Sequence, residues 1–170
     1  ERKGHKFIIN AVSKLKDKFP DLIYLIAGKG PYLEEIKKYV RQLSLENHVV
    51  FLGWITEPEK SLILKNSEVF AMTPTTVGES VEGFGMAFID AAFHGIPSVG
   101  SRSGGISDAI IENETGLLAE AGNQEEITKK LTELLGNVEL RTKLGQRGRE
   151  IAESQYSWEN KIIEYLEAAN

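Results

Sequence analysis

The chain has 170 residues, of which 41% are hydrophobic and 26% are charged. This length allows one α/β domain with a sizeable core and is too short for two large ones. The net charge of -5 at pH 7 argues against nucleic acid as a partner, because binding to phosphate backbones needs a dense basic surface. The absence of cysteine excludes disulfides and thiolate metal sites. No apolar run approaches the roughly 20 residues that cross a bilayer, and residues 1–6 do not form a signal peptide, so we expect a cytoplasmic protein.

Short apolar segments alternate with helical patterns along the chain. Apolar residues recur with helical spacing from Phe7 to Phe19, and Pro20 ends that helix. The expected strands are residues 22–27, 49–52, 69–72, 96–99 and 117–119. The other expected helices are residues 31–43, 58–66, 84–94, 124–135, 140–152 and 158–169. This order is typical of a Rossmann-like parallel sheet with helices on both faces, and the fold class is therefore α/β.

The start of the chain lacks one element of this pattern. The sequence enters a helix directly at about Gly4, whereas the helix of a βαβ unit normally follows a strand of the same sheet. We therefore expect the first strand of the sheet to lie upstream of residue 1.

A polar loop and the apolar helix after it carry residues suited to a nucleotide sugar. Glu82 lies in the loop, and Gly83, Phe84 and Gly85 lead into a helix whose first N–H groups attract anions such as phosphate. Asp90 follows Glu82 by eight residues, or roughly 12 Å at the helical rise of about 1.5 Å per residue. This separation suits one carboxylate on sugar hydroxyls and the other on ribose hydroxyls, with a diphosphate between them.

These residues also have ordinary structural explanations. Glu82 fits a carboxylate near the N-cap of the helix, and Asp90 fits a solvated helix residue. The apolar neighbours of Asp90 favour a partner for it, because an unpaired buried carboxylate is costly. Gly28 and Gly30 form a glycine turn after a strand, which is a weak signal for a phosphate loop, since most such turns only connect strand to helix tightly.

Several runs of the sequence resemble the retaining glycosyltransferases of family 4, which have the GT-B fold. They are EGFGMAFIDAAFHGIPSV, GGISD, TGLL, the Lys3-Gly4 pair and YSWE at 156–159, so the resemblance covers nearly the whole chain. It implies that residues 1–170 are a single C-terminal domain that binds a nucleoside-diphosphate sugar. It also implies that an N-terminal acceptor-binding domain is absent and that the anomeric configuration is retained.

The resemblance assigns roles to particular residues. Glu82 corresponds to the glutamate that contacts the donor sugar, and Lys3 to the lysine that neutralises the donor diphosphate. Asp90 stands where the family has a glutamate that holds the ribose, and it is one methylene shorter. Asp108 likewise replaces the glutamate of the G-G-x-x-E element at 104–108. The remaining donor-binding positions implied by the family are Gly28, Gly30, Gly83, Phe84, Gly85 and Met86.

Two other function classes also fit the sequence. A non-catalytic GT-B-like partner subunit fits the Asp residues at 90 and 108, and a sugar-nucleotide epimerase fits the same architecture. We expect no cofactor and no metal, because the sequence has no D-x-D motif or carboxylate cluster. The expected partners are a nucleotide sugar, the N-terminal domain of the same enzyme and, for the full-length protein, the inner face of a membrane.

Overall fold

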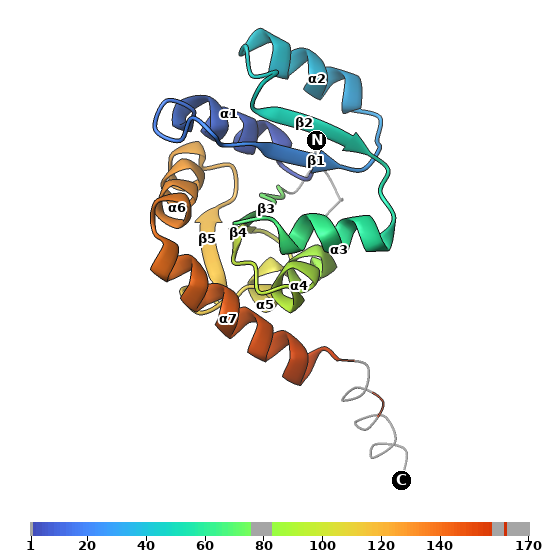
Figure 1. The fold of residues 1–170 in the computed structure, drawn as a ribbon, viewed down its shortest axis with the longest axis vertical. Coiled ribbons are helices and arrows are strands. Elements are labelled where there is room, and N and C mark those ends of the chain that lie inside the picture. Colours follow the sequence, from blue (N-terminus) through green and yellow to red (C-terminus); the bar gives the residue numbers. More distant parts are fainter. Residues whose placement is uncertain (1, 76–82, 158–161, 163–170) are drawn as a thin grey trace.

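The computed structural model describes residues 2–75, 83–157 and 162 of the chain (Figure 1). The strands are β1 (Tyr24–Ala27), β2 (Val49–Gly53), β3 (Phe70–Ala71), β4 (Ser98–Arg102) and β5 (Gly116–Glu120). The helices are α1 (His5–Leu15), α2 (Leu33–Gln42), α3 (Glu57–Lys65), α4 (Met86–Phe93), α5 (Ile106–Ala109), α6 (Gln124–Gly136) and α7 (Val138–Gln155). The alternation of strands and helices confirms the predicted α/β class.

The strands are parallel, but they are divided between two sheets. In the smaller sheet β1 pairs with β2, with Tyr24 opposite Val49. In the larger sheet β4 lies between β3 and β5, with Ser98 opposite Gly116. Among the described residues, β1 and β3 are therefore edge strands that do not pair with each other.

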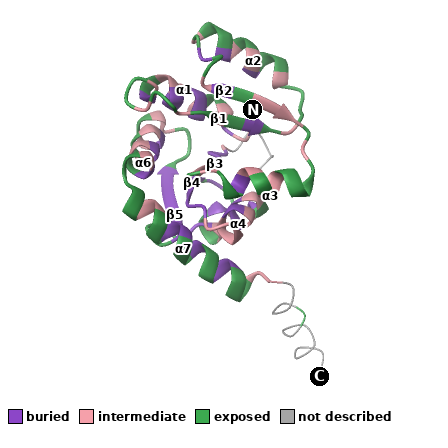
Figure 2. Cartoon of the chain, in the orientation of Figure 1, coloured by how far each residue is buried: buried purple, intermediate pink, exposed green. Residues whose placement is uncertain are grey.

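The largest core cluster connects the helices of the first and last parts of the chain to the strands. α1 packs against α6, and α6 also contacts β4 and β5 (Figure 1). β4 and β5 are buried except at their last residues (Figure 2), and the buried residues of β4 include the polar Ser98 and Ser101. Fully buried members of this cluster include Ile9, Leu45, Val99, Ile127 and Leu134. Burial of this apolar surface is the main stabilising contribution to the fold.

A second, smaller cluster fixes α4 on the larger sheet. Phe88 of α4 is buried, and its ring meets that of Phe70 edge to face, with the ring centroids 5.3 Å apart. Ile106 and Ile110, at either side of the short helix α5, complete this cluster. The packing holds the first turn of α4 next to the loop that follows β4.

Several element boundaries differ from the sequence prediction. α1 ends at Leu15, and the chain continues in turns to Phe19, whose N–H donates to the Leu15 carbonyl at 2.8 Å. α5 was not predicted, because a helix of four residues has no measurable periodicity. α7 begins at Val138, since the Asn137 side chain accepts a hydrogen bond from Leu140 N–H at 2.9 Å. The predicted helix at 158–169 lies outside the described residues, apart from residue 162.

Candidate functional site at the carboxyl ends of the strands

The loops that follow the parallel strands meet at one edge of the structure. Ligands of open α/β sheets bind at this edge, outside the carboxyl ends of the strands. The start of α1 reaches the same edge, because Thr73, just after β3, donates a hydrogen bond from Oγ1 to the Gly4 carbonyl at 3.3 Å. Buried Ser101 of β4 donates to the carbonyl of Pro74, which fixes the next part of this loop. Lys3 therefore lies at the edge where the other predicted site residues are found.

The N-terminus of α4 has the geometry that the sequence predicts for an anion site. Gly85 is the N-cap and has φ 77°, a left-handed conformation that favours glycine. A Cβ atom at Gly85 would lie 2.8 Å from both Ile106 Cδ1 and Phe88 Cδ2, so the position also lacks space for a side chain. Met86, the first helical residue, is 63% exposed. α4 has no acidic residue in its first turn that could occupy the first N–H groups of the helix.

Gly83 and Gly105 bring two loops into direct contact beside this helix start. Gly105 N–H donates to the Gly83 carbonyl at 2.9 Å. A Cβ atom at Gly105 would lie 2.4 Å from that carbonyl oxygen, whereas a Cβ atom at Gly83 would meet nothing within 4 Å. The segment 104–108 therefore packs through Gly105 against the carbonyl of Gly83. The space where a Cβ atom of Gly83 would lie is open.

Asp90 lies on α4 and forms an ion pair that links this helix to α3. Its Oδ2 is 2.9 Å from Nζ of Lys60, which also lies 2.7 Å from Oε2 of Glu57. These two carboxylates raise the pKa of Lys60 above its ordinary value, chiefly through the hydrogen bond to Asp90. The side chain of Asp90 is 35% exposed. Lys60 lines the same groove as Asp90, and no signal in the sequence points to it.

The estimate of the distance between Glu82 and Asp90 needs correction. α4 begins at Met86, and Gly83, Phe84 and Gly85 before it are not helical, so the helical rise does not apply to all eight residues. Glu82 lies outside the described residues. Its predicted role on the donor sugar is therefore not tested by the geometry.

The glycine turn after β1 leaves open space at the same edge. Gly28 has φ 117° and donates its N–H to the carbonyl of Gly53, at the end of β2, at 2.6 Å. Gly53 has φ 69°, so both positions favour glycine for their backbone conformation. Cβ atoms at Gly28, Gly30 or Gly53 would meet nothing within 4 Å. A ligand can therefore approach the backbone closely here.

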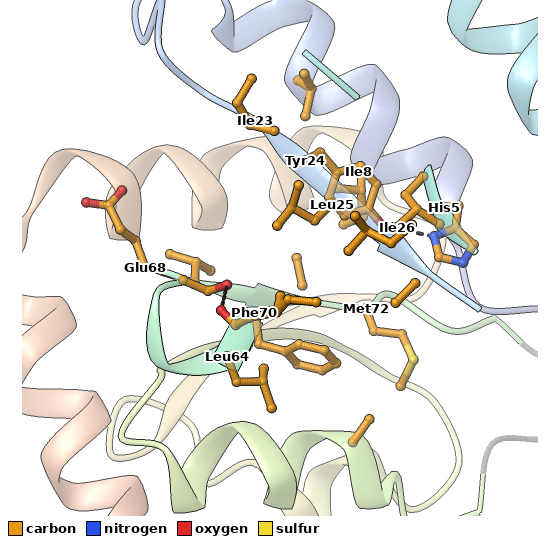
Figure 3. Close-up of a pocket in the computed structure, with 18 of the residues that line it drawn as sticks. His5, Ile8, Ile23, Tyr24, Leu25, Ile26, Leu64, Glu68, Phe70 and Met72 are labelled. Atoms are coloured by element: carbon orange, nitrogen blue, oxygen red, sulfur yellow. Dashed lines mark hydrogen bonds between the residues drawn. The ribbon is translucent and has the colours of Figure 1, made fainter. Parts of the chain in front are cut away.

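A groove of about 670 Å³ connects several of these residues (Figure 3). Lys3, Gly28 and Asp90 line it, together with Lys60 and Trp54. The structure thus brings Lys3, Gly28 and Asp90 to one cavity. The sequence favours Trp54 as an anchor in the core or at a domain contact. Trp54 is 75% exposed, so a core position is wrong, and the domain contact stays a prediction. Trp158, for which the sequence favours the same anchoring role, lies outside the described residues.

The histidines are more integrated into the fold than the sequence suggests. His5 Nδ1 lies 2.8 Å from the Tyr24 hydroxyl, and both groups line the groove. Burial lowers the pKa of His5, with a smaller contribution from the charge of Lys3, and burial raises the pKa of the Tyr24 hydroxyl. His48 Nδ1 lies 2.9 Å from the Leu22 carbonyl. The sequence favours surface positions for His5 and His48, and the structure has both half-buried.

The sequence favours a capping or surface role for His94 over a catalytic one, and the structure confirms the capping role. It is the C-cap residue of α4, and its Nδ1 lies 2.8 Å from the Asp90 carbonyl of the last turn. Its Nε2 lies 2.8 Å from Oγ of Ser61 on α3. Together with the Lys60 ion pair, this contact fixes the position of α4 relative to α3.

Comparison with known proteins identifies the family. The family model described as glycosyl transferases group 1 matches residues 1–151. The chain belongs to this family. A GDP-mannose-dependent alpha-(1-6)-phosphatidylinositol monomannoside mannosyltransferase of Mycolicibacterium smegmatis is 32% identical over 162 residues, which make up 94% of this chain and 42% of that protein. The group 1 domain described here therefore spans less than half the length of this relative.

Solved structures show the same fold. Anabaena Alr3699/HepE in complex with UDP has a TM-score of 0.84 and 21% identity, over 99% of this chain and 46% of that one. The C-terminal domain of LpcC, a group 1 glycosyl transferase of Francisella tularensis, has a TM-score of 0.80 and 23% identity, over 92% of this chain and 81% of that one. The group 1 domain thus has the architecture of the C-terminal half of a GT-B glycosyltransferase, as predicted.

Two further findings concern metals and membranes. Within residues 2–75 and 83–157, no cluster of His, Asp or Glu side chains is arranged to hold a metal ion. None of the described helices combines the length and apolar character that a membrane span requires. Independence from metal and location in the cytoplasm both stay predictions.

Proposed function

We propose that this chain is the donor-binding half of a retaining glycosyltransferase of family 4, which transfers a hexose from a nucleoside diphosphate to an acceptor. The observation that carries the proposal is the helix start formed by the N-cap Gly85 and the exposed Met86, which lies at the carboxyl edge of the strands beside a groove lined by Lys3 and Asp90. A helix N-terminus with glycines around it suits a diphosphate. Lysine and carboxylate groups at this edge suit the charges and hydroxyls of a nucleotide sugar.

The mechanism follows from where charge develops during the reaction. Negative charge builds on the departing nucleoside diphosphate, and the N–H groups of α4 and the ammonium of Lys3 stabilise it. Asp90 accepts hydrogen bonds from the ribose hydroxyls and so fixes the nucleoside. Glu82 orients the donor sugar through its hydroxyls. The acceptor attacks the same face from which the diphosphate leaves, so this half of the enzyme supplies no nucleophile.

The remaining partners belong to the full-length enzyme. Residues that hold the acceptor lie on an N-terminal domain, across an interdomain cleft of the kind in which ligands bind. The name of the mycobacterial relative indicates GDP-mannose as donor and a phosphatidylinositol mannoside as acceptor for that protein. GDP-mannose is therefore the first donor to test here, and peripheral contact of the full-length enzyme with the inner face of the membrane is part of the proposal.

A panel of nucleotide sugars incubated with the full-length enzyme tests the function. We expect release of nucleoside diphosphate with one donor, and NMR of the product should show the anomeric configuration of that donor. Inversion of configuration would contradict the family 4 assignment. A nucleotide sugar epimerised at one carbon would favour the epimerase alternative, and absence of nucleotide binding by calorimetry would favour a non-catalytic partner subunit.

A further inference from the structure

α7 packs closely against α4 (Figure 1). Gly145 of α7 passes so near to the turn after α4 that a Cβ atom at this position would lie 2.0 Å from the carbonyl oxygen of Gly95. Further along α7, a Cβ atom at Gly148 would lie 3.6 Å from Cβ of Ala92, near the end of α4. The contacts move toward the start of α4 as α7 proceeds, so the two helices run antiparallel.

The end of α7 reaches the loop that precedes α4. Ala152 of α7 and Ile89 of α4 line one cavity of about 60 Å³, and Tyr156 lines the same cavity. Tyr156 is the C-cap residue of α7, and its N–H donates to the Ala152 carbonyl at 2.9 Å. Its ring meets the ring of Phe84, with the centroids 5.5 Å apart and the planes tilted by 53°. Rings at this separation attract each other, so α7 holds Phe84 in place.

The loop at 83–85 is thus held through two independent contacts. One is the ring contact of Phe84 with Tyr156. The other is Gly105, whose N–H donates to the Gly83 carbonyl at 2.9 Å and whose Cβ position lies 3.3 Å from Cα of Phe84. Two of the three loop residues are glycines, which have more conformational freedom to lose than other residues. Contacts that order such a loop before a ligand arrives lower the entropy cost of binding.

We propose that Tyr156 is a positioning residue for the donor diphosphate. Its ring fixes Phe84, and Phe84 holds the backbone N–H groups of the loop and of the first turn of α4 in the orientation that phosphate oxygens require. Phe84 then serves the donor through its backbone, because its ring is packed against α7. The inference rests on the proposed function, since it concerns the loop to which the diphosphate is assigned there.

Calorimetry with the full-length enzyme tests this role, with GDP and UDP as diphosphate probes and guanosine and uridine as the matching nucleosides. Tyr156→Ala should raise the dissociation constant of whichever diphosphate binds by about three- to tenfold, the range expected for loss of an aromatic pair, and should leave that of its nucleoside unchanged. Tyr156→Phe keeps the ring and should bind both as the unmodified enzyme does. Leu144→Val is the matched control, because Leu144 is a buried residue of α7 in the largest core cluster. It should lower the urea midpoint without changing nucleotide affinity.

A double-mutant cycle shows whether the effect passes through Phe84. Phe84→Ala alone and Phe84→Ala combined with Tyr156→Ala should bind the diphosphate equally weakly, because the second change has no ring left to act on. Additive effects of the two changes would overturn the inference. An unchanged diphosphate affinity of Tyr156→Ala, or an equal loss of diphosphate and nucleoside affinity, would also overturn it.

Hydrogen exchange without nucleotide gives a readout that does not depend on the proposed function. The amides of residues 83–87 should exchange faster in Tyr156→Ala than in the unmodified enzyme or in Leu144→Val, because the loop has lost one of its two contacts. Equal rates in all three would overturn the inference, whatever the enzyme binds. If the unmodified enzyme bound neither GDP nor UDP, the proposed function would fail, and this role would fail with it even if Tyr156→Ala loosens the loop.

Discussion

Lys60 and Asp90 join α3 to α4 through an ion pair, with Nζ of the lysine 2.9 Å from Oδ2 of the aspartate. This pair directs one oxygen of Asp90 toward α3. If Asp90 holds the ribose as proposed, its other oxygen would accept hydrogen bonds from the ribose hydroxyls. Lys60 would then act as a positioning residue for this carboxylate.

Replacement of Asp90 by Ala in the full-length enzyme should weaken nucleoside diphosphate binding by about 1 to 3 kcal/mol, since a hydrogen bond to a charged group is lost. Lys60→Gln should weaken it severalfold, because Asp90 keeps its charge but loses its orientation. Glu57→Gln is the matched control, since Glu57 contacts Lys60 from an exposed position and should leave affinity unchanged. Calorimetry measures all three, and an unchanged dissociation constant for Asp90→Ala would remove this residue from the site.

Gly83 and Gly105 should respond differently to an added methyl group. Gly83→Ala has open space around its Cβ, so the urea midpoint should stay the same while nucleotide affinity drops, because the methyl group blocks the approach of a phosphate. Gly105→Ala places its Cβ 2.4 Å from the Gly83 carbonyl and should lower stability by about 1 to 3 kcal/mol. If Gly83→Ala binds nucleotide as tightly as the unmodified enzyme, no phosphate lies at that loop.

Glu82 should affect turnover more than nucleotide binding. In the full-length enzyme, Glu82→Ala removes a contact to the donor sugar, so turnover should fall strongly while the bare nucleoside diphosphate binds nearly as before. Steady-state kinetics and calorimetry with the same preparation separate the two effects. An equal loss of turnover and of diphosphate affinity would contradict a role on the sugar.

His5 should make the stability of the chain depend on pH near neutrality. Burial lowers its pKa below the ordinary 6.5, so the unfolded state binds the proton more tightly than the folded state. Stability is then fully present above about pH 6.5 and decreases as the pH falls through the folded pKa. Urea midpoints between pH 7.5 and 5.5 measure this decrease, which His5→Gln should reduce. An NMR titration that gives the His5 ring a pKa at or above 6.5 in the folded chain would refute this account.

Much of the fold could be predicted from local patterns. The apolar run at 49–52 forms β2, as its sequence predicts. α4 begins directly after Gly85, because the φ of 77° at its N-cap favours glycine. The glycine N-cap of that helix could also be predicted, since it depends only on sequence near Gly85, and the anion site there stays a prediction. These features follow from interactions between residues close together in the chain.

Features that depend on distant residues could not be predicted. Lys60 and Asp90 are 30 positions apart, and only the packing of α3 against α4 brings them together. The contact of His5 with Tyr24 also requires that α1 lie across β1. The division of the strands into two sheets likewise depends on which strands pair, and local apolar patterns do not give the pairing.

Hydrogen exchange of the full-length enzyme, measured with and without saturating GDP or UDP, tests the central claim most directly. The claim is that the donor diphosphate binds at the start of α4. We predict that the amides of residues 83–87 and of the turn at 28–30 exchange more slowly in the presence of the correct nucleotide. The reason for residues 83–87 is that phosphate oxygens accept hydrogen bonds from their N–H groups. Binding of the nucleotide without protection of residues 83–87, or with protection confined to α6 and α7, would contradict the account.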